Sequence, residues 1–461
     1  MTRATVTNAR DDSHHPPILA ALWVAFLFVL PFHRIWTLPW LGAKLQPPEL
    51  VFVGLAVFAV FSWWRGGLRW HPVACDAGAA AWLVACVAST VTGQGHLRFS
   101  DAQALTETLG SVSLVCLYGA VRLTATPDLL SRFGTWFGAS AAMAAAFGLA
   151  GVFMAWSGAP TRLATVVITL VPYLEHAPRA QAFTAGPQML ASILLLAVPL
   201  FVASRLNEGW RRRDSAVLLG LLLGLVATMS KTALCVVPAL AVMWAVGPRR
   251  TSQPPAGLAR TRVWLAAATW CLVALVFVAG SHVMLVRDAE VSRWAAGQVV
   301  AGAPIASFEW RGERWRVMPT TYVHNKRASL LAIEESWPRG IGPAQQPAFT
   351  ARLQREGRMP ASMVAPYTTP HSTYLGPVAE LGALGLIALV LLLVTGGLGI
   401  RRLIGASGVP RWEAAAYAGA GAAFLIEATS TDLMNCRHYW WLLAIVAARA
   451  ASLPRRVSST G

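Results

Sequence analysis

Apolar runs of about twenty residues recur along this chain and constrain its fold more than any other feature. A helical run of this length matches the hydrocarbon thickness of a bilayer. We expect about twelve such spans, at 17–33, 50–64, 75–93, 107–123, 136–157, 188–204, 214–230, 232–247, 262–281, 373–398, 412–429 and 438–453. The sequence therefore predicts an all-α, polytopic membrane protein whose 461 residues form one integral-membrane domain.

Composition and charge agree with this prediction. Charged residues make up 13% of the chain and hydrophobic residues 56%, whereas soluble proteins carry about 25% charged residues. The net charge of +17 does not require a nucleic-acid partner, because basic residues gather in alternate loops, as at Arg212 and Arg401. By the positive-inside rule these loops and both termini are cytoplasmic. The six cysteines form no CxxC pair, so no metal site is signalled.

One connection, 281–370, is too long to be a bare loop and would face the outer side of the membrane. It contains a helix signal in which Asn325 is the expected N-cap and apolar residues follow at helical spacing. Pro338 and Gly340 would end this helix. We therefore expect a cap with short helices over the membrane domain.

His371 stands between a Thr-Thr-Pro turn and the start of a predicted span. An imidazole at this boundary can exchange protons near neutral pH. A single histidine is also common as a structural residue, so both interpretations stay open. Ser372, beside it, would cap the following helix or bind a ligand.

Three cations are candidates on the same side. Lys231 lies in a tight turn at membrane depth, where ionisable residues often have a function. Arg179 lies just outside a span, and Arg327 lies in the loop helix. The alternatives are side chains that reach the interface for Lys231 and Arg179, and a solvated helix face for Arg327. Arginine forks and a lysine charge suit a diphosphate. The chain has no P-loop, HExxH or GxSxG motif.

Three segments stand out when taken together: RAQAFTAGPQMLASILLLAVPL (Arg179–Leu200), RASLLAIEESWPRGIGPA (Arg327–Ala344) and PHSTYLGPVAELGALGLIALVLLL (Pro370–Leu393). In this order they resemble the O-antigen ligase and polymerase superfamily of membrane glycosyltransferases. The resemblance covers roughly residues 170–400. Two positions depart from the family pattern: Lys231 stands in a turn that usually reads Ser-Arg-Gly, and Gly186 stands where asparagine is usual.

The resemblance implies a GT-C-like membrane fold and a metal-independent, inverting transfer without a cofactor. The donor would be a glycan on undecaprenyl diphosphate at the periplasmic face of the bacterial inner membrane. His371 would be the general base, and Arg327, Lys231 and Arg179 would bind the diphosphate. The isoprenoid tail would lie between helices, among membrane lipids. Glu380, deeper in the same helix, would be either a structural partner of another helix or a residue that handles protons.

Several functions share this donor chemistry. A ligase uses lipid A–core as acceptor, a polymerase uses a second lipid-linked repeat, and a protein O-oligosaccharyltransferase uses serine or threonine; we favour the ligase. A transporter of polysaccharide or lipid is the alternative from another class. It predicts inverted repeats and functional residues at mid-membrane, whereas an enzyme of this family would gather them at the outer face.

Overall fold

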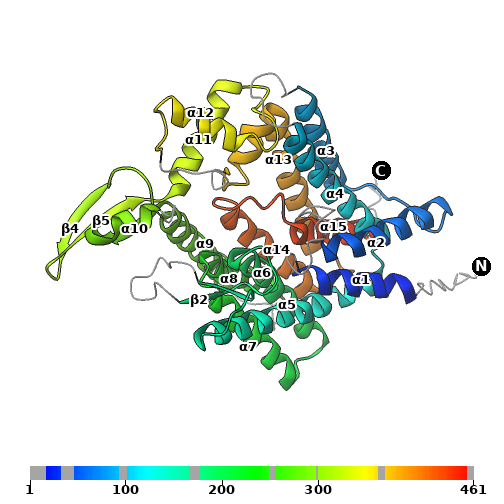
Figure 1. The fold of residues 1–461 in the computed structure, drawn as a ribbon. Helices are drawn as coiled ribbons and strands as arrows, with labels where there is room; N and C mark the ends of the chain where they lie inside the picture. Colours follow the sequence, from blue (N-terminus) through cyan, green and yellow to red (C-terminus); the bar gives the residue numbers. More distant parts are fainter. Residues whose placement is uncertain are drawn as a thin grey trace, which may run out of the picture.

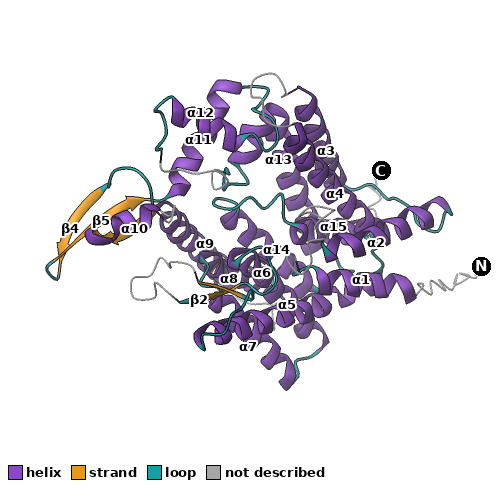
Figure 2. Cartoon of the chain, viewed as in Figure 1, coloured by secondary structure: helices purple, strands orange, loops and turns teal. Residues whose placement is uncertain are grey.

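The computed structural model describes residues 17–32, 46–92, 101–166, 177–248, 256–296, 300–361 and 369–453. Helices dominate these ranges (Figures 1 and 2). The sequence predicts that both termini are cytoplasmic, and both termini lie outside the described residues. Each predicted apolar stretch contains a helix: α1 (Pro17–Val29), α2 (Pro47–Trp64), α3 (Ala74–Thr92), α4 (Asp101–Thr124), α5 (Pro127–Trp156), α6 (Pro187–Glu208), α7 (Arg212–Ala227), α8 (Val236–Val246), α9 (Ala256–His282), α13 (Leu375–Ile404), α14 (Arg411–Glu427) and α15 (Arg437–Ala451).

Seven helices of the described chain are long and apolar enough to cross a membrane, judged by length and composition. They are α2, α3, α4, α5, α6, α9 and α13. A multi-pass membrane protein accounts for them, and the larger count of about twelve spans stays a prediction. The run from 214 to 247 divides into two helices, as expected. Their division lies at Met229, which has a left-handed φ of 46°.

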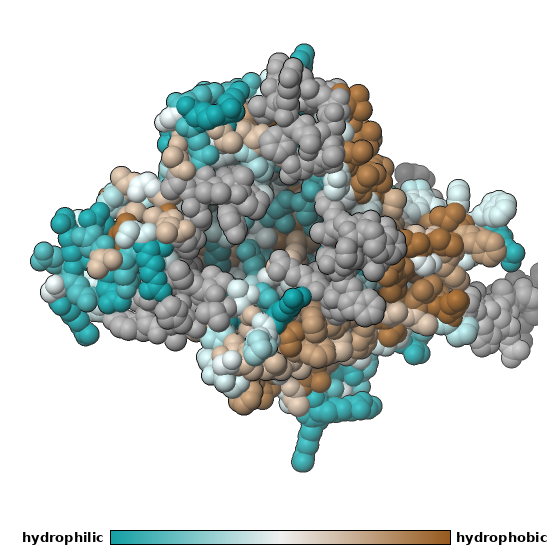
Figure 3. All heavy atoms as spheres, viewed as in Figure 1, coloured by the Kyte–Doolittle hydropathy of each residue, from teal (hydrophilic) through white to brown (hydrophobic). Residues whose placement is uncertain are grey.

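Burial separates a central helix from peripheral ones. Most residues of α6 are buried, whereas α9 leaves large apolar side chains such as Trp264, Leu272 and Leu275 exposed. Hydrophobic residues also cover the flank near α2 and α3, and hydrophilic residues cover the loop helices and the strands (Figure 3). Large exposed apolar surfaces are unfavourable in water. Lipid is the solvent that suits these faces, which supports their placement in a membrane.

Two small antiparallel sheets correct the prediction of an all-α chain. One pairs β1 (Ala164–Val166) with β2 (Pro178–Ala180), and the other has the strand order β3 (Val283–Arg287), β5 (Glu313–Pro319), β4 (Ala306–Trp310). The larger sheet follows α9 directly and buries one side against α10 (Val291–Ala296). Its strands are short, and their exposed residues break the apolar alternation that identifies a strand in a sequence.

The cap continues with α11 (Thr321–Ser336) and α12 (Gln346–Arg355), which lie beside α13 (Figure 1). The predicted N-cap at Asn325 is wrong, because the N-cap of α11 is Thr320, five residues earlier. Asn325 is instead buried inside the helix. The predicted end is confirmed: α11 stops at Ser336, just before Pro338.

The segment after α11 docks backbone to backbone onto α13. Helical geometry in α13 breaks at Gly382, where φ is 63° and ψ is −142°. Ala383 N–H donates to the Pro338 carbonyl at 2.8 Å, and Ile341 N–H donates to the Ala379 carbonyl at 2.9 Å. A Cβ at Gly382 would meet the Pro338 oxygen at 2.1 Å. Only glycine fits both this conformation and this close approach, so the segments 380–382 and 340–342 have a structural role in joining the cap to the helix.

We expect Gly382→Ala to destabilise the protein by about 3 kcal/mol or more, since strain at positive φ adds to a backbone clash. Gly220→Ala is the matched control: α7 leaves open space around Gly220, so the change should be neutral or stabilise by about 0.5–1 kcal/mol. Thermal unfolding of the purified variants measures the difference. Equal unfolding midpoints for the two variants would contradict the docking role of Gly382.

Candidate functional site

His371 is held in a conformation that few residues other than glycine adopt. Its φ is 45°, which costs about 1–2 kcal/mol for a residue with a Cβ. The following residues fix it in place. The Ser372 hydroxyl accepts from Tyr374 N–H and Leu375 N–H, each at 3.3 Å, just before and at the start of α13. Thr373 N–H donates to the Ala428 carbonyl at 2.9 Å. Strain retained by surrounding bonds is typical of functional positions.

An aromatic ring and a lysine lie against His371. The Tyr322 ring of α11 is 4.9 Å from the His371 ring, centroid to centroid. Lys231 Nζ lies 4.0 Å from the centroid of the same Tyr322 ring. It also donates a hydrogen bond to Ser281 Oγ at 2.6 Å. Lys231 begins a short 3₁₀-helix, Lys231–Cys235, which follows the break after α7. The cap, α9 and this turn therefore meet near His371, which lies four residues before the first residue of α13.

A second lysine joins the cluster. Lys326 Nζ is 2.7 Å from His282 Nε2 at the end of α9. Burial lowers the pKa of Lys326 to about 8. Burial, reinforced by the charges of Lys231 and Lys326, lowers the pKa of His371 to about 4. His371 is therefore neutral at physiological pH, which is the state that can accept a proton.

Arg179 lies on β2 and supports the lysine turn. Its Nε donates to the Thr228 carbonyl at 2.9 Å, next to the end of α7. A cation at a helix C-terminus interacts favourably with the helix dipole. Burial lowers the pKa of Arg179, and the charge interaction with Tyr322 partly offsets this effect. The structure thus brings Arg179, Lys231 and His371 around Tyr322.

Two other predicted residues lie elsewhere. Arg327 is exposed on α11, while its neighbour Lys326 faces the cluster. Glu380 accepts hydrogen bonds from the backbone N–H groups of Ala344 and Gln346, so it links the chain just after Gly342 to α13. Its side chain lines a different cavity from the His371 cluster.

Sequence reasoning missed Tyr322, Lys326, Ser281 and His282. Tyr322 and Lys326 are four residues apart, so they share one face of α11. The misplaced helix start hid this relation, because it left Tyr322 outside the helix. Ser281 and His282 carried a weaker signal, as polar residues at the end of an apolar run.

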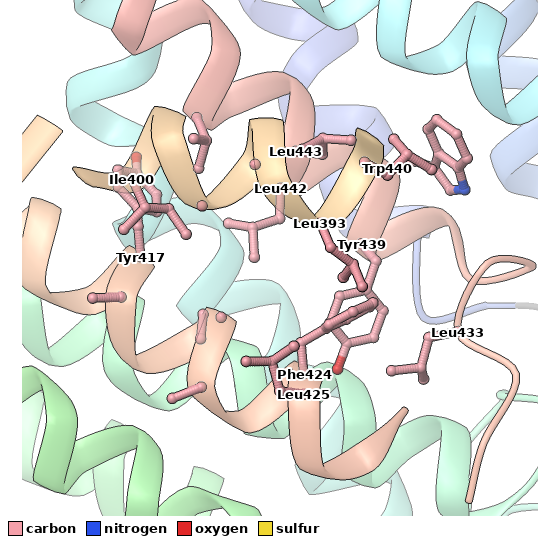
Figure 4. A pocket seen from close by; sticks show the side chains of 18 of the residues that line it. Leu393, Ile400, Tyr417, Phe424, Leu425, Leu433, Tyr439, Trp440, Leu442 and Leu443 are labelled. Carbon is pink, nitrogen blue, oxygen red and sulfur yellow. The ribbon is translucent and has the colours of Figure 1, made fainter. Parts of the chain in front are cut away.

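An apolar groove of 380 Å³ lies between α13, α14 and α15 (Figure 4). Leu393, Phe424 and Leu443 line it, and small residues such as Gly397 and Gly421 make room for it. One end reaches Leu433 and Met434, whose loop bonds to Thr373 beside His371. The groove therefore runs among the helices from the region of the candidate site.

Among the described residues, no group of three or more His, Cys, Asp or Glu side chains is arranged to hold a metal ion. No family model matches the chain, and no curated protein matches it. The family resemblance described from the motifs therefore stays a prediction.

The lowered pKa of His371 predicts a pH-dependent stability. The unfolded chain binds a proton at the ordinary pKa of 6.5 and the folded chain only near 4, so the free energy of unfolding falls as pH drops from 6.5 to 4. The loss is at most about 3 kcal/mol. His371→Asn removes this contribution, and asparagine tolerates positive φ. Thermal unfolding between pH 7 and 4 should show a shallower decline for the variant; parallel curves would contradict burial of His371.

Proposed function

We propose that this protein is a membrane glycosyltransferase that moves a glycan from undecaprenyl diphosphate to an acceptor sugar hydroxyl, with O-antigen ligation to lipid A–core as the favoured reaction. The observation that carries the proposal is a neutral, conformationally strained histidine beside buried cations at the ends of apolar helices. A polymerase using the same donor is the alternative. The proposal includes the GT-C-like fold, placement in the inner membrane and a site on the periplasmic side.

The cations suit the donor's diphosphate. Lys231 and Lys326 lie near His371, and Arg179 lies beside the turn that carries Lys231. Like charges brought together in a buried site repel one another, so an anionic ligand would relieve the repulsion. In the transition state the same charges would stabilise the negative charge on the departing diphosphate.

His371 would act as general base in a single displacement. Its ring nitrogen takes the proton of the acceptor hydroxyl while that oxygen bonds to the anomeric carbon. The bond between this carbon and the phosphate oxygen breaks, and the diphosphate leaves with the electron pair. A pKa of about 4 is low for a base at neutral pH. A bound diphosphate would offset the charges of Lys231 and Lys326 and raise the pKa of His371, so donor binding would activate the base.

The apolar groove in Figure 4 suits the isoprenoid tail. It lies among helices that suit lipid, and one end approaches the loop bonded to Thr373. A tail in this groove would bring the donor's head to the level of His371. Lys231 lies between α7 and α8 and His371 lies before α13, so neither is in the middle of an apolar helix, which supports an enzyme over a transporter.

His371→Asn should abolish transfer, since asparagine cannot accept the proton, while the protein remains folded. The measurement is complementation of a gene deletion, with gels of surface polysaccharide and lipid-linked intermediates. Long polymer left on undecaprenyl diphosphate would indicate a ligase, and loss of long chains with single units still attached would indicate a polymerase. Full complementation by His371→Asn would overturn the proposal. The control is His71→Asn, because His71 is exposed and lies just before α3, far in sequence from His371.

Lys326→Ala and Arg327→Ala separate two neighbouring candidates for the diphosphate. The burial of Lys326 and its contact with His282 predict a loss of about tenfold or more in transfer for Lys326→Ala. The exposed Arg327 predicts a smaller effect. Initial rates with a lipid-diphosphate donor measure both. A larger loss for Arg327→Ala would restore the assignment made from the motif and remove Lys326 from the site.

A further inference from the structure

A second cavity, of 220 Å³, lies beside the chain that leads into His371. Thr369 and Pro370 form part of its wall, and His371 is the next residue along the chain. Liquid water takes about 30 Å³ per molecule, so the cavity has the volume of about seven waters. One sugar ring fits such a space.

The wall of this cavity is acidic. Glu107 of α4, Glu380 of α13 and Asp432 of the loop between α14 and α15 line it. Among the described residues that line the cavity, none is basic. The contrast is strong in a chain with 38 basic and 21 acidic residues. The cations instead gather around Tyr322, so the carboxyl groups and the cations form separate clusters near His371.

The carboxylates repel one another. Burial, with the nearby charge of Glu107, raises the pKa of Asp432 to about 6. Asp432 already accepts from Met434 N–H at 3.2 Å and from Asn435 Nδ2 at 2.8 Å, which fixes its orientation. A bound cation would lower the energy of this arrangement.

An unpartnered donor lies in the same wall. Trp82 lines the cavity and is 4% exposed, and its indole N–H has no hydrogen-bond partner in the described chain. A buried donor without a partner is costly. A ligand hydroxyl would satisfy it, and the indole face offers the flat apolar surface on which a sugar ring packs. Thr108 and Ser111 add hydroxyl groups to the wall.

From the juxtaposition of this acidic, tryptophan-lined cavity with the His371 turn, we infer that it binds an amine-bearing sugar of the acceptor. The carboxylates hold the ammonium group and the sugar hydroxyls, and Trp82 supports the ring. This inference rests on the proposed function for its acceptor role, but the binding of an amino sugar is independent of transfer. The charge difference orients the substrates, because the anionic donor head is attracted to the cations and repelled by the carboxyl groups.

The test is calorimetric titration of the purified, full-length protein in lipid nanodiscs. The probes are methyl glucosaminide, its N-acetyl form and methyl glucoside, which differ in the charged amine. We expect methyl glucosaminide to bind at least tenfold tighter than the other two. Glu107→Gln and Asp432→Asn should each weaken it by about tenfold or more, and Trp82→Phe should weaken all three sugars. Glu335→Gln, at a carboxylate paired with Arg352 and Arg358 on the cap, is the matched control and should change nothing.

Equal affinity for the charged and neutral sugars, or unchanged binding in Glu107→Gln, would overturn the inference. Glu107→Gln keeps the size of the side chain, and its unfolding midpoint verifies that the fold is intact. Separate measurements of transfer and of amino-sugar binding by wild type distinguish the two proposals. If wild type binds the amino sugar but transfers no glycan, the proposed function is wrong and the cavity assignment stands. Transfer by wild type without amino-sugar binding would do the reverse.

Discussion

The backbone junction between the segment after α11 and the break in α13 determines where the candidate site forms. Gly382 opens α13, and the chain from Pro338 to Gly342 fills the opening with its own N–H and carbonyl groups. Buried backbone groups must be paired, so this exchange of hydrogen bonds fixes the cap on the membrane domain. It sets the position of α11 relative to the turn before α13, and hence which side chains of α11 reach His371.

Burial then gives the site its chemistry. Tyr322 separates Lys231 from His371 and contacts both, so positive charge and a neutral imidazole coexist within one cluster. Removing water strengthens every charge interaction there. Cations that are buried close together repel one another, and an anionic ligand would relieve this repulsion. The lowered pKa of His371 is one sign of that cost.

Cationic, acidic and apolar groups lie on separate surfaces around His371. Cations lie around Tyr322, carboxylates line the cavity beside Pro370, and His371 lies near both. The apolar groove among α13, α14 and α15 approaches the same loop that bonds to Thr373. Anionic, cationic and apolar parts of substrates would therefore each find a separate surface around one turn.

The sequence by itself determined the apolar helices, the break near Lys231, the long cap segment and the candidacy of His371, because hydrophobicity, turn residues and charge placement are local properties of a chain. Tertiary structure decided which charges meet. A predicted start of α11 that is five residues too late leaves Tyr322 outside the helix. Successive residues of a helix point about 100° apart, so Lys326 rather than Arg327 faces the cluster. The acidic cavity draws Glu107, Glu380 and Asp432 from three separate segments of the chain, and no local pattern could have joined them.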